Sequence, residues 1–186
     1  MKNKVDKKWI GLITALSFFV SVAITFAAER ALEGAGVIVA FVLLFIFVAA
    51  GIVFDMIGVA VTSASPAPFH SMASHREPGA EQALRLLKNA DKAASICNDV
   101  VGDVSGVVSG ATAAALAARL VSGASLQAML VPLILSGLVA GATIGGKAAG
   151  KNVALRHSTR ILLLVGKLLR VLSPGKGRRR AGKPRR

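Results

Sequence analysis

The chain has 186 residues, of which 54% are apolar, and its mean hydropathy is +0.64. Only 17% of its residues are charged, whereas soluble domains carry about 25%, so an ordinary soluble domain is excluded. Its 23 Lys and Arg outnumber 9 Asp and Glu and give a formal charge of +14, which favours anionic partners.

Four apolar stretches fill most of the chain. They cover residues 9–28, 36–61, 93–121 and 126–146, and each has the roughly 20 residues that a membrane helix needs. We therefore predict an all-α fold, a polytopic membrane bundle of four transmembrane helices with amphipathic surface helices. Residues 1–28 are expected to form a retained N-terminal transmembrane anchor, because their apolar region exceeds the roughly 7–15 residues of a signal peptide.

The basic residues are distributed unevenly between the two sides of this bundle. They precede the first stretch, separate the second from the third and follow the fourth, whereas the opposite connections carry only Arg30 and Arg119. Connections rich in Lys and Arg stay in the cytoplasm. We expect a multi-pass plasma-membrane protein with both termini cytoplasmic.

Two amphipathic helices are predicted on the cytoplasmic side. The first covers residues 81–88, after Pro66 and Pro68 end the second membrane helix. The second covers residues 153–172, and its cationic face suits anionic headgroups. The basic residues expected to face lipid are Arg156, Arg160, Lys167 and Arg170.

The end of the sequence is strongly basic. Residues 174–186 include seven Lys or Arg and cannot bury a core, so a disordered polybasic tail is predicted. We interpret it as an anchor to anionic lipid of the membrane. Ribosomal RNA or another acidic partner is the alternative, but no specific nucleic acid is expected, because such runs bind without sequence specificity.

Two ladders of glycines at four-residue spacing occur in the third and fourth stretches. Small residues at this spacing let membrane helices approach closely. The ladders predict close packing within the chain, and a homodimer face is the alternative; the two are compatible. The glycines are Gly102, Gly106 and Gly110 in one stretch and Gly137, Gly141 and Gly145 in the other.

Polar residues interrupt the apolar stretches at similar depth. Ionisable groups inside membrane helices are costly, so Asp55, Asp99 and Asp103 are candidate functional residues. At a rise of about 1.5 Å per residue, Asp55, Asn98, Asp99 and Gly146 fall in one slab near the inner leaflet, and Asp103 lies one turn deeper.

Carboxylate, amide and carbonyl oxygens are hard ligands, suited to Mg²⁺, Mn²⁺ or Ca²⁺. The pair Gly145-Gly146 is expected to loosen the helix and free carbonyl groups. The alternative is structural. The aspartates would then cap helices, bond to Ser105 or Ser109, or neutralise Lys147 and Lys92.

Four segments stand out in order along the chain: FDMIGVAVTSAS (54–65), EQALRLLKNAD (81–91), Cys97-Asn98 and GGKAAGKNVALRH (145–157). In the same order they resemble FSxxETALTSxS, AxxLLxNPD, GN and FGExxPKxLAxRH, which are motifs of the CorC/cyclin M magnesium-transporter membrane domain. On this resemblance, residues 36–173 are a CorC/cyclin M-like membrane domain. The chain departs from the family at Gly58, Lys147 and Gly150, where the family has Glu, Glu and Pro. Nucleotide gating through CBS domains is not expected, because a basic tail follows the last helix.

The resemblance implies a dimeric membrane domain that binds dehydrated Mg²⁺. By position, its ligand roles fall on Asp55, Asn98 and the Gly146 carbonyl, with Asp99 and Asp103 as lining charge. We therefore expect binding and transport of a divalent cation, Mg²⁺ first and Mn²⁺ or Ca²⁺ next. The rival hypothesis is a non-transporting membrane scaffold, which predicts each carboxylate paired with a Lys, Arg or hydroxyl. An enzyme is not expected, because the sequence shows no nucleophile–base pair or phosphate-binding loop.

Overall fold

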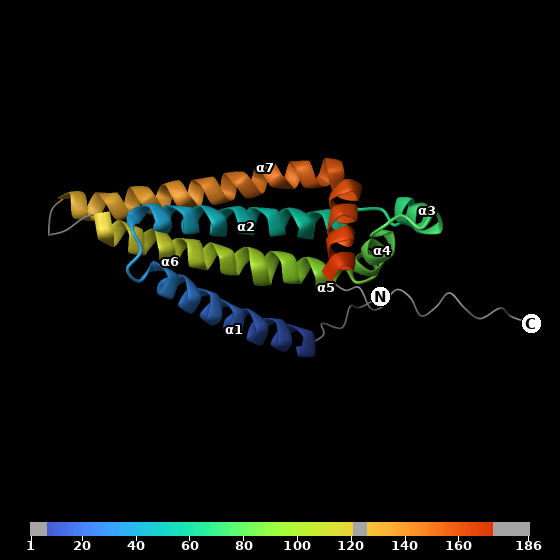
Figure 1. Cartoon of the computed structure of the whole chain (residues 1–186), viewed down its shortest axis with the longest axis horizontal. Coiled ribbons are helices and arrows are strands. Elements are labelled where there is room, and N and C mark those ends of the chain that lie inside the picture. Colours follow the sequence, from blue (N-terminus) through green and yellow to red (C-terminus); the bar gives the residue numbers. More distant parts are fainter. Residues whose placement is uncertain (1–6, 121–125, 173–186) are drawn as a thin grey trace, which may run out of the picture.

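The described part of the chain, residues 7–120 and 126–172, is built from helices joined by short turns. Figure 1 shows the computed structural model. Its elements are α1 (Lys7–Leu32), α2 (Val37–Ser63), α3 (Ala67–Ser74), α4 (Ala80–Lys88), α5 (Ala90–Ser95), the π-helix η1 (Ile96–Gly102), α6 (Asp103–Leu120) and α7 (Leu126–Leu172). The all-α prediction is confirmed.

Four helical stretches are long and apolar enough to cross a membrane. They are α1, α2, the run α5–η1–α6 (Ala90–Leu120) and α7, with mean hydropathies of 2.2, 3.2, 1.5 and 1.9 in their most apolar windows. The architecture is therefore compatible with a multi-pass membrane protein. The third stretch is the least apolar, yet 56% of its window is buried inside the bundle, against 17% or less for the others. Its hydroxyl residues Ser105, Ser109 and Thr112 are buried among its neighbours, whereas its charged residues are exposed.

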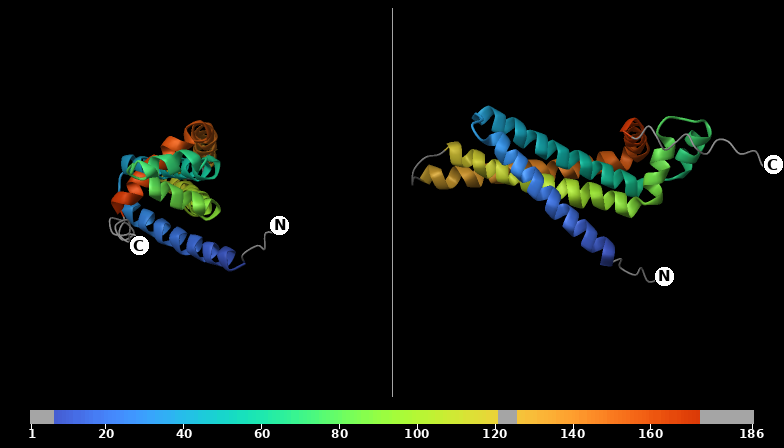
Figure 2. Two further views of the ribbon diagram at one scale, coloured as in Figure 1. Left: turned by 90° about the vertical axis from the view of Figure 1, so that its right-hand side faces the viewer. Right: turned by 60° about the horizontal axis from the view of Figure 1, so that its bottom comes forward.

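Three of these stretches form the body of the bundle. α2 packs along both α7 and α6, α6 contacts α7, and α1 leans against α6 and then diverges (Figures 1 and 2). The start of α1 and the end of α7 lie at the same end of the bundle as α3 and α4 (Figure 1). We call this the α3–α4 end.

At the opposite end, an arginine of α6 connects that helix to the end of α1. Arg119, near the end of α6, donates hydrogen bonds to the carbonyl oxygens of Leu32 (2.6 Å) and Ala35 (2.7 Å). The last carbonyl groups of a helix have no partner within the helix, so Arg119 supplies one for the end of α1. Leu32 also packs with Leu44 and Leu116 of the neighbouring helices.

At the α3–α4 end, the last part of α7 crosses the bundle. α7 consists of two helical parts that meet at a kink at His157 (φ −121°, ψ 24°). The second part turns across the bundle (Figure 1, red) and covers most of the range 153–172 in which an amphipathic helix was predicted, but it begins at the kink rather than at residue 153. Leu162 packs against Phe69 and Ala83 in a common core.

Two glycines allow this crossing. A Cβ on Gly166 of α7 would overlap the carbonyl oxygen of Gly79, and a Cβ on Gly79 would lie 2.5 Å from the Lys167 nitrogen. Gly79 also adopts φ +91°, a conformation that favours glycine. A side chain at either position would separate the two backbones.

Most of the predicted glycine ladders do not mediate close packing within the chain. A Cβ on any of five of these glycines would meet nothing within 4 Å in the described structure, so the prediction of close packing is wrong for them: Gly106, Gly110, Gly137, Gly141 and Gly145. Only Gly102 lies in a tight contact. The homodimer face stays a prediction.

Candidate cation site

Three charged residues from three helices meet near the α3–α4 end of the bundle. The Nζ atom of Lys147 on α7 lies 3.8 Å from Asp55 Oδ1 on α2 and 3.6 Å from Asp103 Oδ1 at the start of α6. The side chains of Asp55 and Lys147 are 22% and 25% exposed, whereas that of Asp103 is 72% exposed. Lys147 thus holds a positive charge between one sheltered and one open carboxylate.

Bare glycine backbone makes room for this ammonium group. A Cβ on Gly102 would lie 3.8 Å from Lys147 Nζ, 3.3 Å from the Cys97 carbonyl oxygen and 3.9 Å from the Gly51 carbonyl oxygen. The two carbonyl oxygens therefore border the same small space as the ammonium. A cation in this space would meet oxygen atoms from α2, η1 and α6.

The backbone is wound differently at this level. Residues Ile96–Gly102 form a π-helix, and the Asp103 N–H bonds to the Asn98 carbonyl oxygen, five residues back. Single π-turns inside α-helices are rare and frequently lie at functional sites. The sequence analysis missed this element, because no residue pattern distinguishes a π-turn from the α-helix around it.

Asn98 has an unsatisfied atom within this segment. Its side-chain oxygen, Oδ1, is fully buried and has no hydrogen-bond partner among the described residues. The amide lies against Gly58 of α2, one turn after Asp55, and a Cβ on Gly58 would overlap Oδ1. An unsatisfied buried acceptor costs about 1–3 kcal/mol, so this oxygen is placed where a ligand would relieve a cost.

The other predicted site residues lie differently. Asp99 is exposed and forms no ion pair or hydrogen bond with the residues that the structure describes. Gly146 packs against the Ile52 side chain, and α7 keeps helical dihedral angles there. The expectation that Gly145-Gly146 loosens the helix is therefore wrong: close packing on α2 keeps this segment regular, and the winding changes in η1.

Some of the structural pairings predicted for the aspartates are present in the described residues, and others are not. Of the two lysines considered as partners of the aspartates, Lys147 takes that role, whereas the Lys92 ammonium lies over the Trp9 ring at 4.8 Å. The Ser109 hydroxyl donates to the Gly106 carbonyl of its own helix. Within residues 7–120 and 126–172, no three His, Cys, Asp or Glu side chains gather closely enough to hold a metal.

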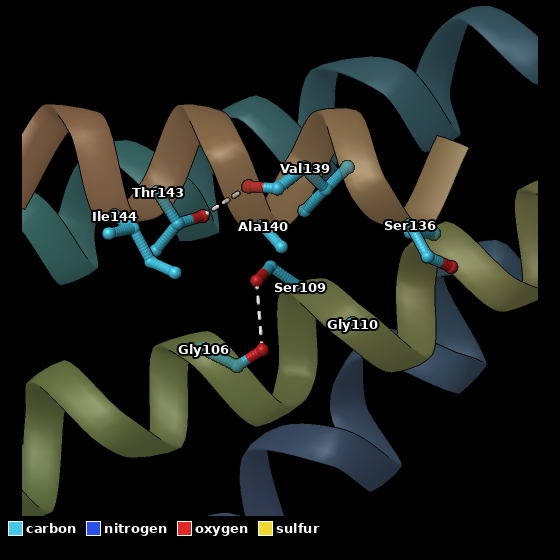
Figure 3. Close-up of a pocket in the computed structure, with 9 residues that line it drawn as sticks. Gly106, Ser109, Gly110, Ser136, Val139, Ala140, Thr143 and Ile144 are labelled. Atoms are coloured by element: carbon cyan, nitrogen blue, oxygen red, sulfur yellow. Dashed lines mark hydrogen bonds between the residues drawn. The ribbon is translucent and has the colours of Figure 1, made fainter. Parts of the chain in front are cut away.

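A second hollow lies between α6 and α7 and is less suited to ions. It has a volume of about 230 Å³ and is lined largely by carbon (Figure 3). The Ser109 and Thr143 hydroxyls at its wall donate to the carbonyl groups of Gly106 and Val139 on their own helices (Figure 3). The hollow therefore offers little to a cation.

The four basic residues expected to face lipid are exposed. They lie on α7 near and beyond its kink, beside exposed leucines that include Leu164 and Leu168. Apolar and cationic groups side by side suit the boundary between acyl chains and headgroups. These residues are Arg156, Arg160, Lys167 and Arg170. The polybasic tail lies outside the described residues.

Comparisons with protein-family models, curated proteins and solved structures found no match to this chain. The CorC/cyclin M resemblance therefore rests on the sequence motifs and stays a prediction.

Proposed function

We propose that this chain is an integral membrane protein that binds a divalent cation and passes it across the plasma membrane. Mg²⁺ is the first candidate, and Mn²⁺ and Ca²⁺ are the others. The observation that carries the proposal is the buried Oδ1 of Asn98, which has no hydrogen-bond partner among the described residues. It lies against Gly58, one turn from Asp55, in a segment that membrane hydrocarbon would surround. An oxygen acceptor without a donor is a ready ligand for a hard cation.

The charge at this level also supports a divalent ion. Asp55, Asp99 and Asp103 carry three negative charges, and Lys147 carries one positive charge, which leaves two negative charges. One divalent cation would neutralise them. Isolated charge in a bundle surrounded by lipid is expensive, so neutralisation favours binding.

The distribution of basic residues supports the proposed orientation. The α3–α4 end collects the basic residues of α4, α5 and the crossing part of α7, whereas the opposite end has Arg30 and Arg119. By the positive-inside rule, the α3–α4 end is cytoplasmic. Both termini would then be cytoplasmic, with anionic lipid held by the basic residues near the kink. A homodimer through the open glycine ladders would complete the assembly.

A second candidate is a non-transporting membrane scaffold. The observation in its favour is that Lys147 pairs with Asp55 and Asp103, which such a protein requires. It leaves the Asn98 oxygen unexplained, so we rank it second.

Thermal unfolding of the detergent-solubilised protein distinguishes the two functions. A ligand at a hundredfold excess over its Kd stabilises the folded state by about 2.7 kcal/mol. Mg²⁺ or Mn²⁺ should therefore raise the unfolding temperature, while choline at matched ionic strength should not. No shift with any divalent cation would favour the scaffold.

Two variants locate the binding. Asp55→Asn should remove most of the divalent shift, because it deletes a charged ligand and keeps the volume. Asp91→Asn, the same change at an exposed position on α5, should leave it intact. A full shift in Asp55→Asn would refute this site. Ion flux into reconstituted vesicles then tests transport.

A further inference from the structure

We infer that Lys147 determines the selectivity of this site. Its ammonium group acts as a tethered monovalent cation that excludes Na⁺ and K⁺ from Asp55, and only a divalent ion displaces it from that carboxylate. The inference rests on the proposed function, and it assigns a role to a residue at which the CorC/cyclin M resemblance fails.

The ammonium group is held loosely. Its distances of 3.8 Å and 3.6 Å to the two carboxylates exceed the roughly 2.7–2.9 Å of a direct charge-assisted hydrogen bond. It therefore occupies the space between Asp55 and Asp103 without a short bond to either. A lysine side chain has a flexible four-carbon stem, so its head can move within that space at small cost.

The two carboxylates differ in exposure, and this difference lets the Lys147 ammonium group move away from Asp55 while it stays near Asp103. Asp55 is sheltered at 22% exposure, and Asp103 is open at 72%. When a cation takes Asp55, Lys147 can keep Asp103 and move toward its exposed side. The cation would then reach Asp55 and the Gly51 and Cys97 carbonyl oxygens from the space beside Gly102.

A tether makes this competition selective by charge. A covalently held competitor acts at an effective concentration in the millimolar range or above. Na⁺ or K⁺ brings no more charge to Asp55 than the ammonium already supplies, so it gains little by displacing Lys147. A divalent cation brings twice the charge and interacts about twice as strongly with the same carboxylate at the same distance.

Competition for Mn²⁺ binding, followed by the electron paramagnetic resonance signal of free Mn²⁺, tests this. In the full-length parent, excess Na⁺ should displace no more Mn²⁺ than choline does at equal ionic strength. In Lys147→Gln, Na⁺ should displace Mn²⁺ and choline should not. Without Na⁺, this variant should bind Mn²⁺ at least about tenfold more tightly, because a positive charge near the site is gone.

Lys151→Gln is the matched control. It removes the same charge one turn further along α7, at an exposed residue outside the ion pairs among described residues. It should behave as the parent does. Lys147→Arg, which keeps the charge should Lys147→Gln fold poorly, should still exclude Na⁺.

The outcomes separate the two proposals. If the parent and Lys147→Gln both bind Mn²⁺ and Na⁺ competes with neither, the selectivity role of Lys147 is wrong and the cation site stands. Equal competition by Na⁺ in the parent and in Lys147→Gln would also overturn the inference. If none of these proteins binds a divalent cation, the proposed function itself fails.

Discussion

Gly58 and Asn98 pack against each other, and the absence of a side chain at Gly58 leaves room for the Asn98 amide. The π-helix η1 directs the Asn98 amide onto α2 at the one residue there without a side chain to obstruct it. In the CorC/cyclin M motif that this segment resembles, a glutamate stands at the position of Gly58. The amide of Asn98 occupies space that a larger residue at position 58 would need.

Gly58→Ala should lower stability by about 1–3 kcal/mol, the usual cost of overpacking a filled contact, because the new methyl group overlaps the Asn98 oxygen. Thermal unfolding in detergent measures it. Gly141→Ala, where nothing lies within 4 Å, is the control and should be neutral or slightly stabilising. Adding Asn98→Ala to Gly58→Ala should recover part of the loss. Full stability in Gly58→Ala would show that Asn98 does not hold this place.

At this scale, sequence reasoning found which residues share a depth but not how they pair. The positions of Asp55 and Asn98 follow from helical rise and from the lengths of the apolar stretches, both of which are local properties. The place of Lys147 between Asp55 and Asp103 depends on the rotation of α7 about its own axis. Packing of Gly146 on Ile52 and of Gly150 on Met56 sets that rotation, and no local pattern reveals it.

At the scale of elements, four long apolar helices were predictable because bilayer thickness sets helix length, and the end of α2 was predictable because Pro66 and Pro68 follow it. The amphipathic pattern of residues 153–172 indicated the part of α7 that crosses the bundle. The start of that part was not predictable, because the kink at His157 lies within a continuous helical pattern.

Gly166→Ala should release the crossing part of α7 from α4, because the new methyl group meets the Gly79 carbonyl. Limited trypsin digestion measures this through faster cleavage after Lys167 and Arg170. Gly145→Ala on the same helix, where a Cβ meets nothing, should digest at the parent rate. An unchanged rate in Gly166→Ala would mean that this contact does not hold the segment.

Arg119→Met should lower the unfolding temperature by a few degrees, because the Leu32 and Ala35 carbonyl groups lose their charged donor. Arg30→Met is the comparison. Among the described residues, Arg30 forms an exposed ion pair with Glu33 and a ring contact with Phe26, and exposed ion pairs contribute little. A larger effect at Arg30 would contradict this assignment.

At the scale of the whole molecule, the charge distribution and the helix order agree. The four long apolar helices return the chain to the end from which it started (Figure 1). The basic residues of α4, α5 and the crossing part of α7 lie at that end. The fold class could be predicted because hydropathy and charge act over whole helices and tolerate local errors.

Labelling of single cysteines in intact cells tests the orientation. With Cys97 replaced by Ala, Ser71→Cys in α3 should react only after permeabilisation, and Ala31→Cys at the end of α1 should react from outside. Both positions are exposed. Reaction of Ser71→Cys from outside would reverse the proposed topology.

The kink at His157 lets two separate sets of contacts position α7. Lys147 lies ten residues before the kink, about 15 Å along the helix, where Gly146 and Gly150 pack on Ile52 and Met56 of α2. Beyond the kink, the crossing segment packs on α4 and α3 through Gly166 and Leu162. The placement of Lys147 between Asp55 and Asp103 is therefore anchored on both sides of the kink.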